Sequence, residues 1–155
     1  MKKVLLITLL FVTASVVYGQ EVTIDPYLEL LRSDVKAQKV ALITEAMKFS
    51  EKDGEKFWPI YREYELELSK VHDSRIKLIK DYAENYENMK ELKARELAQN
   101  SFSLEEKRLS LKRKYFKKIE KALSPIAATR FFQLERQINL LVDLQIATQL
   151  PLIKK

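Results

Sequence analysis

The scarcity of helix-breaking residues is the feature that most limits what this chain can fold into. Only two glycines and four prolines occur in 155 residues, whereas leucine, lysine, glutamate and alanine are abundant. Abundant helix formers with few breakers favour long helices over a fold with many tight turns. The apolar segments repeat at three, four or seven residues, as helices do, and not at two. The chain is therefore expected to be all-α, and its length fits a single domain.

Residues 1–19 have the pattern of a secretory signal peptide. Lys2 and Lys3 precede an apolar run over residues 4–17, and Val17 and Gly19 occupy the positions that a cleavage site requires. The run is shorter than the roughly 20 apolar residues of a membrane span, although a retained anchor helix is the alternative. We expect cleavage after Gly19, or a little earlier near position 14 or 15. The remaining domain, residues 20–155, would then reside in the bacterial periplasm.

The charge balance is basic. The whole chain carries a net charge of +6, and removal of residues 1–19 takes away two lysines and no acid, which leaves +4. A basic chain can bind nucleic acid, but an exported protein seldom meets it. Anionic lipid headgroups, which would be contacted weakly, and acidic or unfolded proteins are the better candidate partners. The absence of cysteine excludes disulfides, zinc–thiolate sites and a thiol nucleophile.

The first two expected helices each begin at a capping signal. Asp25 before a proline predicts a helix reaching about Met47, with an apolar stripe at Leu28, Leu31, Val35 and Leu42. Ser50 followed by Asp53 at the third helical position predicts a second helix over residues 51–85. At 1.5 Å per residue this helix spans about 50 Å, which implies an extended hairpin or bundle.

The polar stretch 82–90 is expected to be a turn, in which Asn88 with Glu91 could cap the third helix. That helix should reach about residue 123. Ser103 marks either a restart of the helix or a tolerated serine, and the continuous apolar pattern favours the latter. Two rows at spacing seven predict that the helix packs along another helix; they are Phe102, Leu109, Phe116 and Leu123, and Leu97, Leu104 and Leu111.

Ser124 and Pro125 predict the start of a fourth helix that ends before Pro151. Its apolar residues surround much of its circumference, so it is either the most buried helix or an interface. The expected stripe comprises Phe131, Leu134, Ile138, Leu141 and Gln145.

The starts of the second and fourth helices resemble each other at an offset of 74 residues. Each has an apolar residue, a capping serine and, six residues after the serine, a basic residue with two aromatics. The matched residues that carry this repeat are Ser50, Asp53, Phe57 and Trp58, and Ser124, Pro125, Phe131 and Phe132. We interpret them as two related helix–turn–helix halves, opening at about 50–85 and 124–150, in which at least one aromatic of each pair is buried.

The two capped segments stand where the repeated L-T-x-x-Q motifs of the periplasmic Spy/CpxP family would stand, and from about Ser33 to Leu152 the chain resembles that family. Serine replaces threonine in both motifs, and Asp53 and Ala127 replace the glutamine. The resemblance implies a hooked hairpin of four helices that forms an antiparallel homodimer with a concave cradle. It also implies ATP-independent chaperoning or a role in the envelope stress response.

The residues needed for catalysis are scarce, and we expect neither an enzyme nor a cofactor. Once residues 1–19 are removed, only Gly54 is left among the glycines, so a phosphate-cradling loop is excluded. His72 is the only histidine, and no serine-hydrolase motif accompanies it, so catalytic and metal sites are not expected. Glu63, Glu65 and Glu67 alternate with other residues on a helix and are interpreted as a solvated face.

The third helix carries a basic face. The lysines fall within a sector of about 100°, opposite the apolar side of the helix; they are Lys107, Lys114, Lys117, Lys118 and Lys121. This lysine face is either an ordinary solvated surface or a cationic surface that attracts acidic clients or anionic headgroups.

Two functions share the expected fold. The first is an exported chaperone-like protein that holds unfolded envelope proteins, and the second is a regulatory partner of the exported domain of a membrane-bound stress sensor. A hydrolase with an unrecognised site is the third hypothesis, which the missing motifs disfavour.

Overall fold

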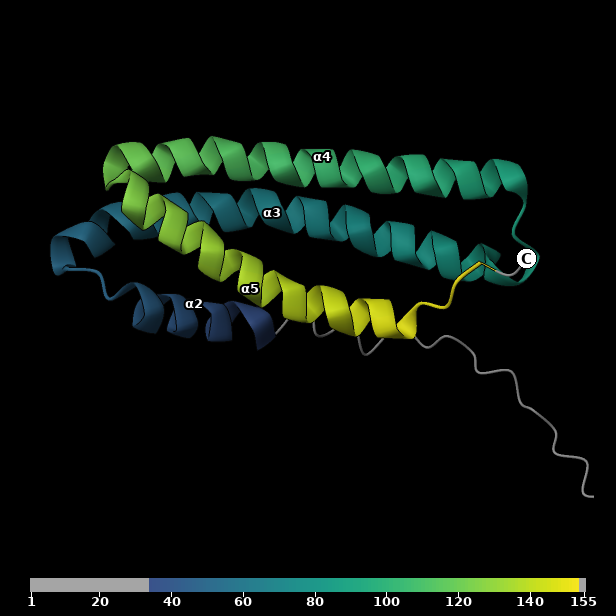
Figure 1. Ribbon diagram of the computed structural model, residues 1–155, viewed down its shortest axis with the longest axis horizontal. Helices are drawn as coiled ribbons and strands as arrows, with labels where there is room; N and C mark the ends of the chain where they lie inside the picture. The colour runs from purple at the N-terminus through teal and green to yellow at the C-terminus, as the bar shows by residue number, and fades with distance from the viewer. Residues whose placement is uncertain (1–33, 154–155) are drawn as a thin grey trace, which may run out of the picture.

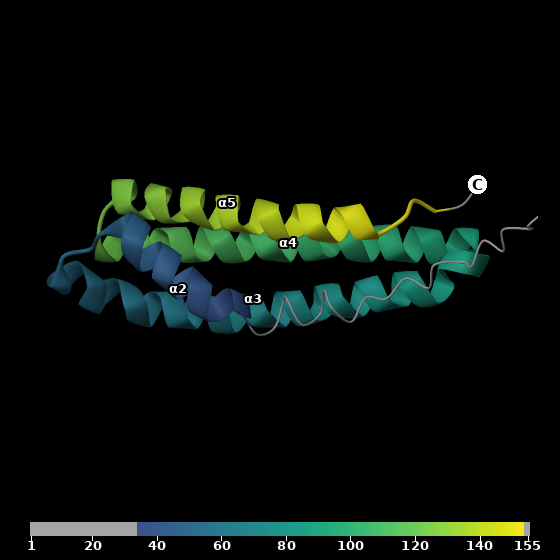
Figure 2. The ribbon, with the colours of Figure 1, turned by 90° about the horizontal axis from the view of Figure 1, so that it is seen from below.

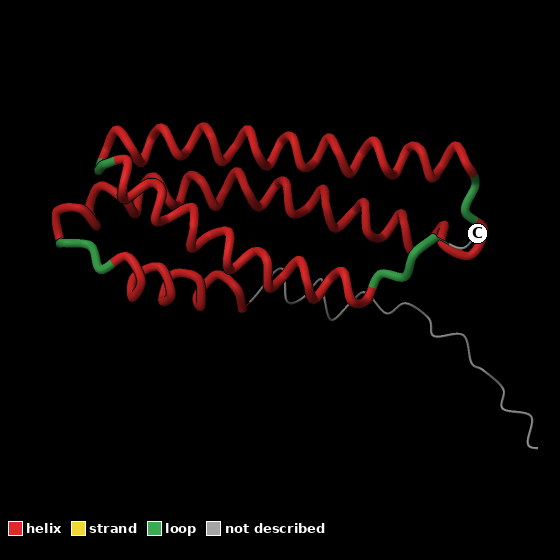
Figure 3. Tube along the Cα trace, in the orientation of Figure 1, coloured by secondary structure: helices red, strands yellow, loops and turns green. Residues whose placement is uncertain are grey.

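The structure is a computed structural model that describes residues 34–153, and all structural statements concern this part of the chain. It contains α2 (Asp34–Met47), α3 (Glu51–Asn85), the short 3-10 turn η1 (Tyr86–Asn88), α4 (Glu91–Ala122) and α5 (Pro125–Gln149). The described residues include no strand (Figure 3), which confirms the all-α prediction. No helix among them is long and apolar enough to cross a membrane. The predicted signal peptide and the Asp25-Pro26 helix start lie outside the described residues.

The two longest helices, α3 and α4, form an elongated antiparallel hairpin (Figure 1). The chain reverses again after α4, so that α5 runs back along the hairpin and packs mainly on α4 (Figure 2). Helix α2 packs on α5, and its Lys39 reaches Glu65 of α3 at 3.4 Å. The expected hooked hairpin of four helices is therefore present. Helices α3 and α4 form its long arms, because both are far longer than an ordinary globular helix.

Both predicted helix starts are capped as the sequence indicated. The Ser50 hydroxyl accepts a hydrogen bond from the Asp53 backbone N–H at 3.2 Å, and the Ser124 hydroxyl accepts one from the Ala127 N–H at 3.1 Å. Ser50 also donates its hydroxyl proton to the Asp53 carboxylate at 2.8 Å. These bonds satisfy N–H groups that the first turn of a helix leaves unpaired, and each cap contributes about 1 kcal/mol.

The core lies near the end of the molecule where α3 and α5 begin. Phe57 and Phe131, each seven residues after its capping serine, are completely buried, and their ring centroids are 5.2 Å apart with an edge-to-face geometry. Tyr64 and Tyr115 are also buried and their rings lie in contact. The prediction that one aromatic of each repeated pair is buried is confirmed, and the two repeats pack directly on each other.

The start of α4 differs from the prediction. Its N-cap is Lys90, without a side-chain hydrogen bond, so Asn88 does not cap this helix. Asn88 instead ends the 3-10 turn that follows directly on α3, which moves the helix start past it. Helix α4 continues through Ser103 without a break, as the apolar rows indicated.

The predicted apolar stripes are displaced on α2, α4 and α5. Among the side chains of α2 that the structure describes, Lys39, Ile43 and Met47 are buried, while Leu42 is exposed. The other residues of the predicted stripe, Leu28, Leu31 and Val35, lie outside the described side chains. On α5 the buried positions include Glu135 and Asn139, whereas Leu141 and Gln145 face solvent. On α4, Leu97 and Leu111 are buried and Leu104 is half-buried, but Phe102 and Leu109 are exposed.

These differences have a common cause. Helices α2 and α5 each cover only part of the α3–α4 hairpin, so only one side of each helix finds a partner. Local periodicity shows that a helix has an apolar sector, but which part of that sector is covered depends on the neighbouring helix.

Candidate functional site

A buried carboxylate organises the interface of α3, α4 and α5. Glu135 of α5 is 5% exposed and accepts a hydrogen bond from the Tyr64 hydroxyl at 2.9 Å. The Lys112 ammonium forms an ion pair with the other Glu135 oxygen, Oε2, at 2.7 Å. The geometry of this pair is not that of a hydrogen bond. A buried carboxylate is costly unless it is paired, and here three helices contribute to its pairing. Burial and the neighbouring Glu135 raise the pKa of Tyr64, which therefore remains a donor at neutral pH.

A second charged cluster lies about two turns further along α5. The Asp143 carboxylate is 2.5 Å from an Arg75 nitrogen of α3 and 3.5 Å from an Arg108 nitrogen of α4. Two guanidinium groups therefore share one carboxylate. The Nε of Arg108 is buried and has no hydrogen-bond acceptor among the described residues. A buried donor without an acceptor costs about 1–3 kcal/mol, so the unpaired Nε is an unfavourable feature of this cluster.

His72 lies beside this cluster on α3. Burial, followed by the positive charges of Lys39, Arg108 and Arg75, lowers the pKa of His72 to about 4, against a smaller opposing effect of Glu135. The imidazole is therefore neutral at pH 7. The His72 side chain is half-buried. No group of three or more His, Cys, Asp or Glu in the described part of the chain is arranged to hold a metal ion.

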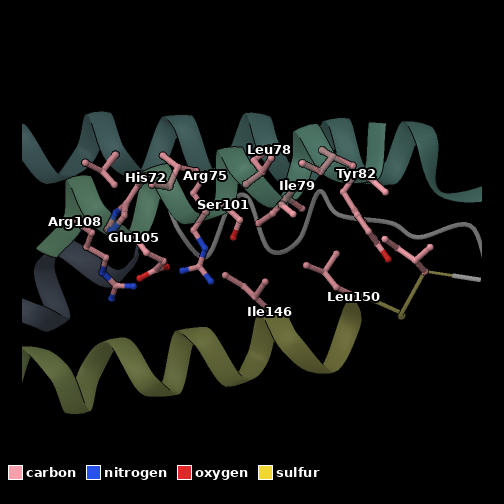
Figure 4. Close-up of a pocket in the computed structure, with 16 residues that line it drawn as sticks. His72, Arg75, Leu78, Ile79, Tyr82, Ser101, Glu105, Arg108, Ile146 and Leu150 are labelled. Carbon is pink, nitrogen blue, oxygen red and sulfur yellow. The ribbon is translucent and has the colours of Figure 1, made fainter. Parts of the chain in front are cut away.

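A cavity extends from this cluster between α3, α4 and α5. Its volume is about 360 Å³. Figure 4 shows His72, Arg75, Glu105 and Arg108 at one end and Tyr82 and Leu150 at the other. Its remaining lining is mainly apolar and includes Leu78, Ile79, Leu97, Leu104 and Ile146. The cavity thus has one charged end and a long apolar body.

Exposed apolar side chains lie on α4 and α5, with charged side chains among them. Leu109 of α4 and Leu140 of α5 line one groove. Phe102 lies one heptad before Leu109, and Leu141 and Leu144 continue the surface over α5. These five residues, the α4–α5 face, are each at least half exposed, with values of 68% for Phe102, 50% for Leu109, 54% for Leu140, 68% for Leu141 and 62% for Leu144. The sequence left two alternatives for the fourth helix, the most buried helix or an interface. The exposure of these leucines on α5 favours an interface.

The lysine face lies on the other side of α4. Lys114 binds Glu67 of α3 at 2.7 Å, and Lys118 binds Glu63 of α3 at 2.6 Å. The Lys114 ammonium, with the Tyr115 hydroxyl, lowers the pKa of the Glu67 carboxyl. Two of the five lysines are thus paired across the hairpin, and three glutamates expected to be solvated each pair with a lysine. Lys107, Lys117 and Lys121 are exposed and have no ion-pair partner in the described region.

The structure brings the repeated motif residues together in the core. Phe57 and Phe131 are in contact, and Phe132 packs on both Phe131 and Tyr64, while Trp58 packs on Phe57. Pro125 is exposed at the first position of α5. These residues build the scaffold beside the charged clusters and do not line the cavity.

Sequence reasoning missed Glu135, Asn139, Arg108 and Asp143. A signal was available for two of them. Glu135 and Asn139 lie four and eight residues after Phe131, in the register of the buried side of α5. Polar residues in a core register indicate a buried network, since a carboxylate is seldom buried without partners. No local pattern identifies Arg108 or Asp143, because their pairing joins separate helices.

No family model, no curated protein and no solved structure matches this chain.

Proposed function

We propose that this protein is an exported, ATP-independent chaperone-like protein that binds unfolded or acidic segments of other envelope proteins. The observation that carries the proposal is the α4–α5 face, on which five large apolar side chains are at least half exposed. Isolated exposed leucines are ordinary, but several exposed apolar side chains on two adjacent helices favour a site that binds protein. The signal-like segment at residues 1–19 supports export, and binding of this kind requires neither a nucleotide nor a catalytic group.

Positive charge borders the apolar surface. Arg113 lies four residues after Leu109, and Arg136 lies four residues before Leu140 and lines the same groove. Both side chains are exposed and have no acidic partner in the described region. Apolar contact with arginines at the rim suits an acidic, partly unfolded segment, whose encounter with the protein would be accelerated by charge. The lysine face on the opposite side of α4 would add long-range attraction only.

The proposal includes the homodimer that the resemblance implies, with the α4–α5 face left available to clients. A second copy of the chain could instead cover this face, and the two arrangements differ in their response to mutation. The experiment therefore measures client protection and oligomeric state on the same variants.

The test is the aggregation of an acidic protein as it unfolds, with the mature chain at a stoichiometric ratio and no nucleotide. The informative variant is Leu141→Ser with Leu144→Ser. The matched control is Leu92→Ser with Ile126→Ser, which removes equally exposed side chains, 77% and 81%, at the start of α4 and of α5. We expect the parent and the control to delay aggregation and the α4–α5 variant to lose most of this effect, with all three equally stable.

Equal protection by the variant and the control would refute the α4–α5 face as the client site. If the α4–α5 variant becomes monomeric in analytical ultracentrifugation while the control stays dimeric, the face is a self-interface. A parent that protects no client would support the second function, binding of the exported domain of a membrane sensor.

A further inference from the structure

The cavity between α3, α4 and α5 has the chemistry of a binding site that is separate from the α4–α5 face. Its charged end contains Arg75 and Arg108, and its apolar body runs toward Leu150 (Figure 4). The volume of about 360 Å³ lies within the range of small-molecule sites. Residues of three helices and of the segment after α5 form the wall of this cavity.

The charged end holds a buried donor without an acceptor in the described part of the chain. Arg75 and Arg108 share the Asp143 carboxylate, and the buried Nε of Arg108 has no acceptor among the described residues. The Glu105 side chain also lines this end, but it is exposed, and no ion pair joins it to either arginine. A carboxylate or phosphate placed here would accept hydrogen bonds from guanidinium groups in the geometry that arginine favours.

The apolar body of the cavity determines which chemistry the rest of the ligand must have. His72 and Tyr82 lie ten positions apart on α3, which corresponds to about 15 Å of helix. The wall along this length consists mainly of leucine and isoleucine. A wholly polar anion would leave this wall in contact with water, and a neutral lipid would leave the Arg108 donor unpaired. Only a molecule with both an acidic head and an apolar tail satisfies both ends.

We infer that the cavity binds a single-chain anionic amphiphile. Its acidic headgroup contacts Arg75 and Arg108 beside His72, and its unbranched tail lies among the leucine and isoleucine side chains toward Leu150. This inference does not depend on the proposed chaperone function, because none of the five residues of the α4–α5 face lines the cavity. Glu105 and Arg108 line both the cavity and the groove beside Leu109 and Leu140.

The chain supplies its own reporter for the test. His72 is the only histidine, so in untagged protein one imidazole signal in an NMR spectrum reports the charged end of the cavity. We would titrate the mature protein with dodecanoate below its micelle concentration. Dodecanol carries the same tail without the charge, and inorganic phosphate carries the charge without the tail. We expect saturable, one-to-one displacement of the His72 signal by dodecanoate, and binding at least tenfold weaker for dodecanol and for phosphate.

Variants separate the two ends of the cavity. Arg108→Gln should weaken dodecanoate binding at least tenfold, whereas Arg95→Gln, which changes an exposed arginine of the same helix, should leave it unchanged. Ala98 lines the cavity at an exposed position, so Ala98→Trp should block the tail and abolish binding without disturbing the core. This second variant keeps the test decisive if Arg108→Gln unfolds the protein.

Equal affinity for dodecanoate and dodecanol, equal losses in Arg108→Gln and Arg95→Gln, or unaltered binding by Ala98→Trp would overturn the inference. A final arm distinguishes a free amphiphile from a membrane lipid. If the protein floats with phosphatidylglycerol vesicles and dodecanoate does not compete, the charged end contacts a membrane surface and the inference is wrong. Competition by dodecanoate would support it.

Discussion

The contact between Phe57 and Phe131 offers the sharpest test of how the two repeats stabilise the fold. Both side chains are completely buried, and the rings meet edge to face at 5.2 Å. Truncation of a buried phenylalanine removes its apolar contacts and leaves a void, at a cost of about 3–5 kcal/mol. We therefore expect Phe57→Ala and Phe131→Ala each to lower the free energy of unfolding by that amount.

The expected change in melting temperature follows from the size of the domain. With an unfolding entropy of about 2.1 cal/mol/K per residue, the roughly 120 described residues give about 0.25 kcal/mol/K. Each substitution should thus lower the melting temperature by about 12–20 °C. Phe102→Ala is the matched control, because Phe102 is 68% exposed and its loss should change the stability by less than about 0.5 kcal/mol.

The double variant tests whether the two rings act on each other. An aromatic pair contributes about 0.5–1.5 kcal/mol beyond its buried area, so the double variant should lose less than the sum of the two single losses by at least that much. Chemical unfolding monitored by helical circular dichroism gives all four values. If both single variants unfold like Phe102→Ala, the rings face solvent and the repeat does not form the core. If the losses of the two single variants are strictly additive in the double variant, both rings are buried but do not interact with each other.

Two further predictions concern charge. The pKa of His72 in the folded protein, about 4, lies below its unfolded value of 6.5, so neutral His72 contributes stability that is fully present above pH 6.5 and is lost as the pH falls toward 4. NMR titration should give this low pKa. Between pH 7 and pH 4 the free energy of unfolding of the parent should fall by about 2–3 kcal/mol more than that of His72→Gln. An equal fall in both proteins would show that His72 does not lie in the environment described. For the lysine face, Lys117→Glu with Lys121→Glu should slow protection of acidic clients but not of neutral ones, and added salt should have the same effect on the parent. Unchanged protection by this folded variant would reduce the unpaired lysines to a role in solubility.

The helices and their starts could be read from the sequence, because they depend on local interactions. Few breakers, apolar repeats near 3.6 residues and the serines at 50 and 124 specified where α3 and α5 begin. The burial of Phe57 and Phe131 followed from the same repeat. Each of these features is decided within one or two helical turns, where residue type and spacing suffice.

The partners of the charged residues were decided only by the tertiary structure. Glu135 is paired because Tyr64 and Lys112 reach it from two other helices, and Asp143 is shared by arginines from α3 and α4. Likewise, Lys114 resembles Lys121 on the helical wheel, yet only Lys114 meets a glutamate of α3. The cavity and the α4–α5 face arise in the same way. A helix presents several possible sides to its neighbours, and only the packing of the helices determines which side is covered and which charges meet.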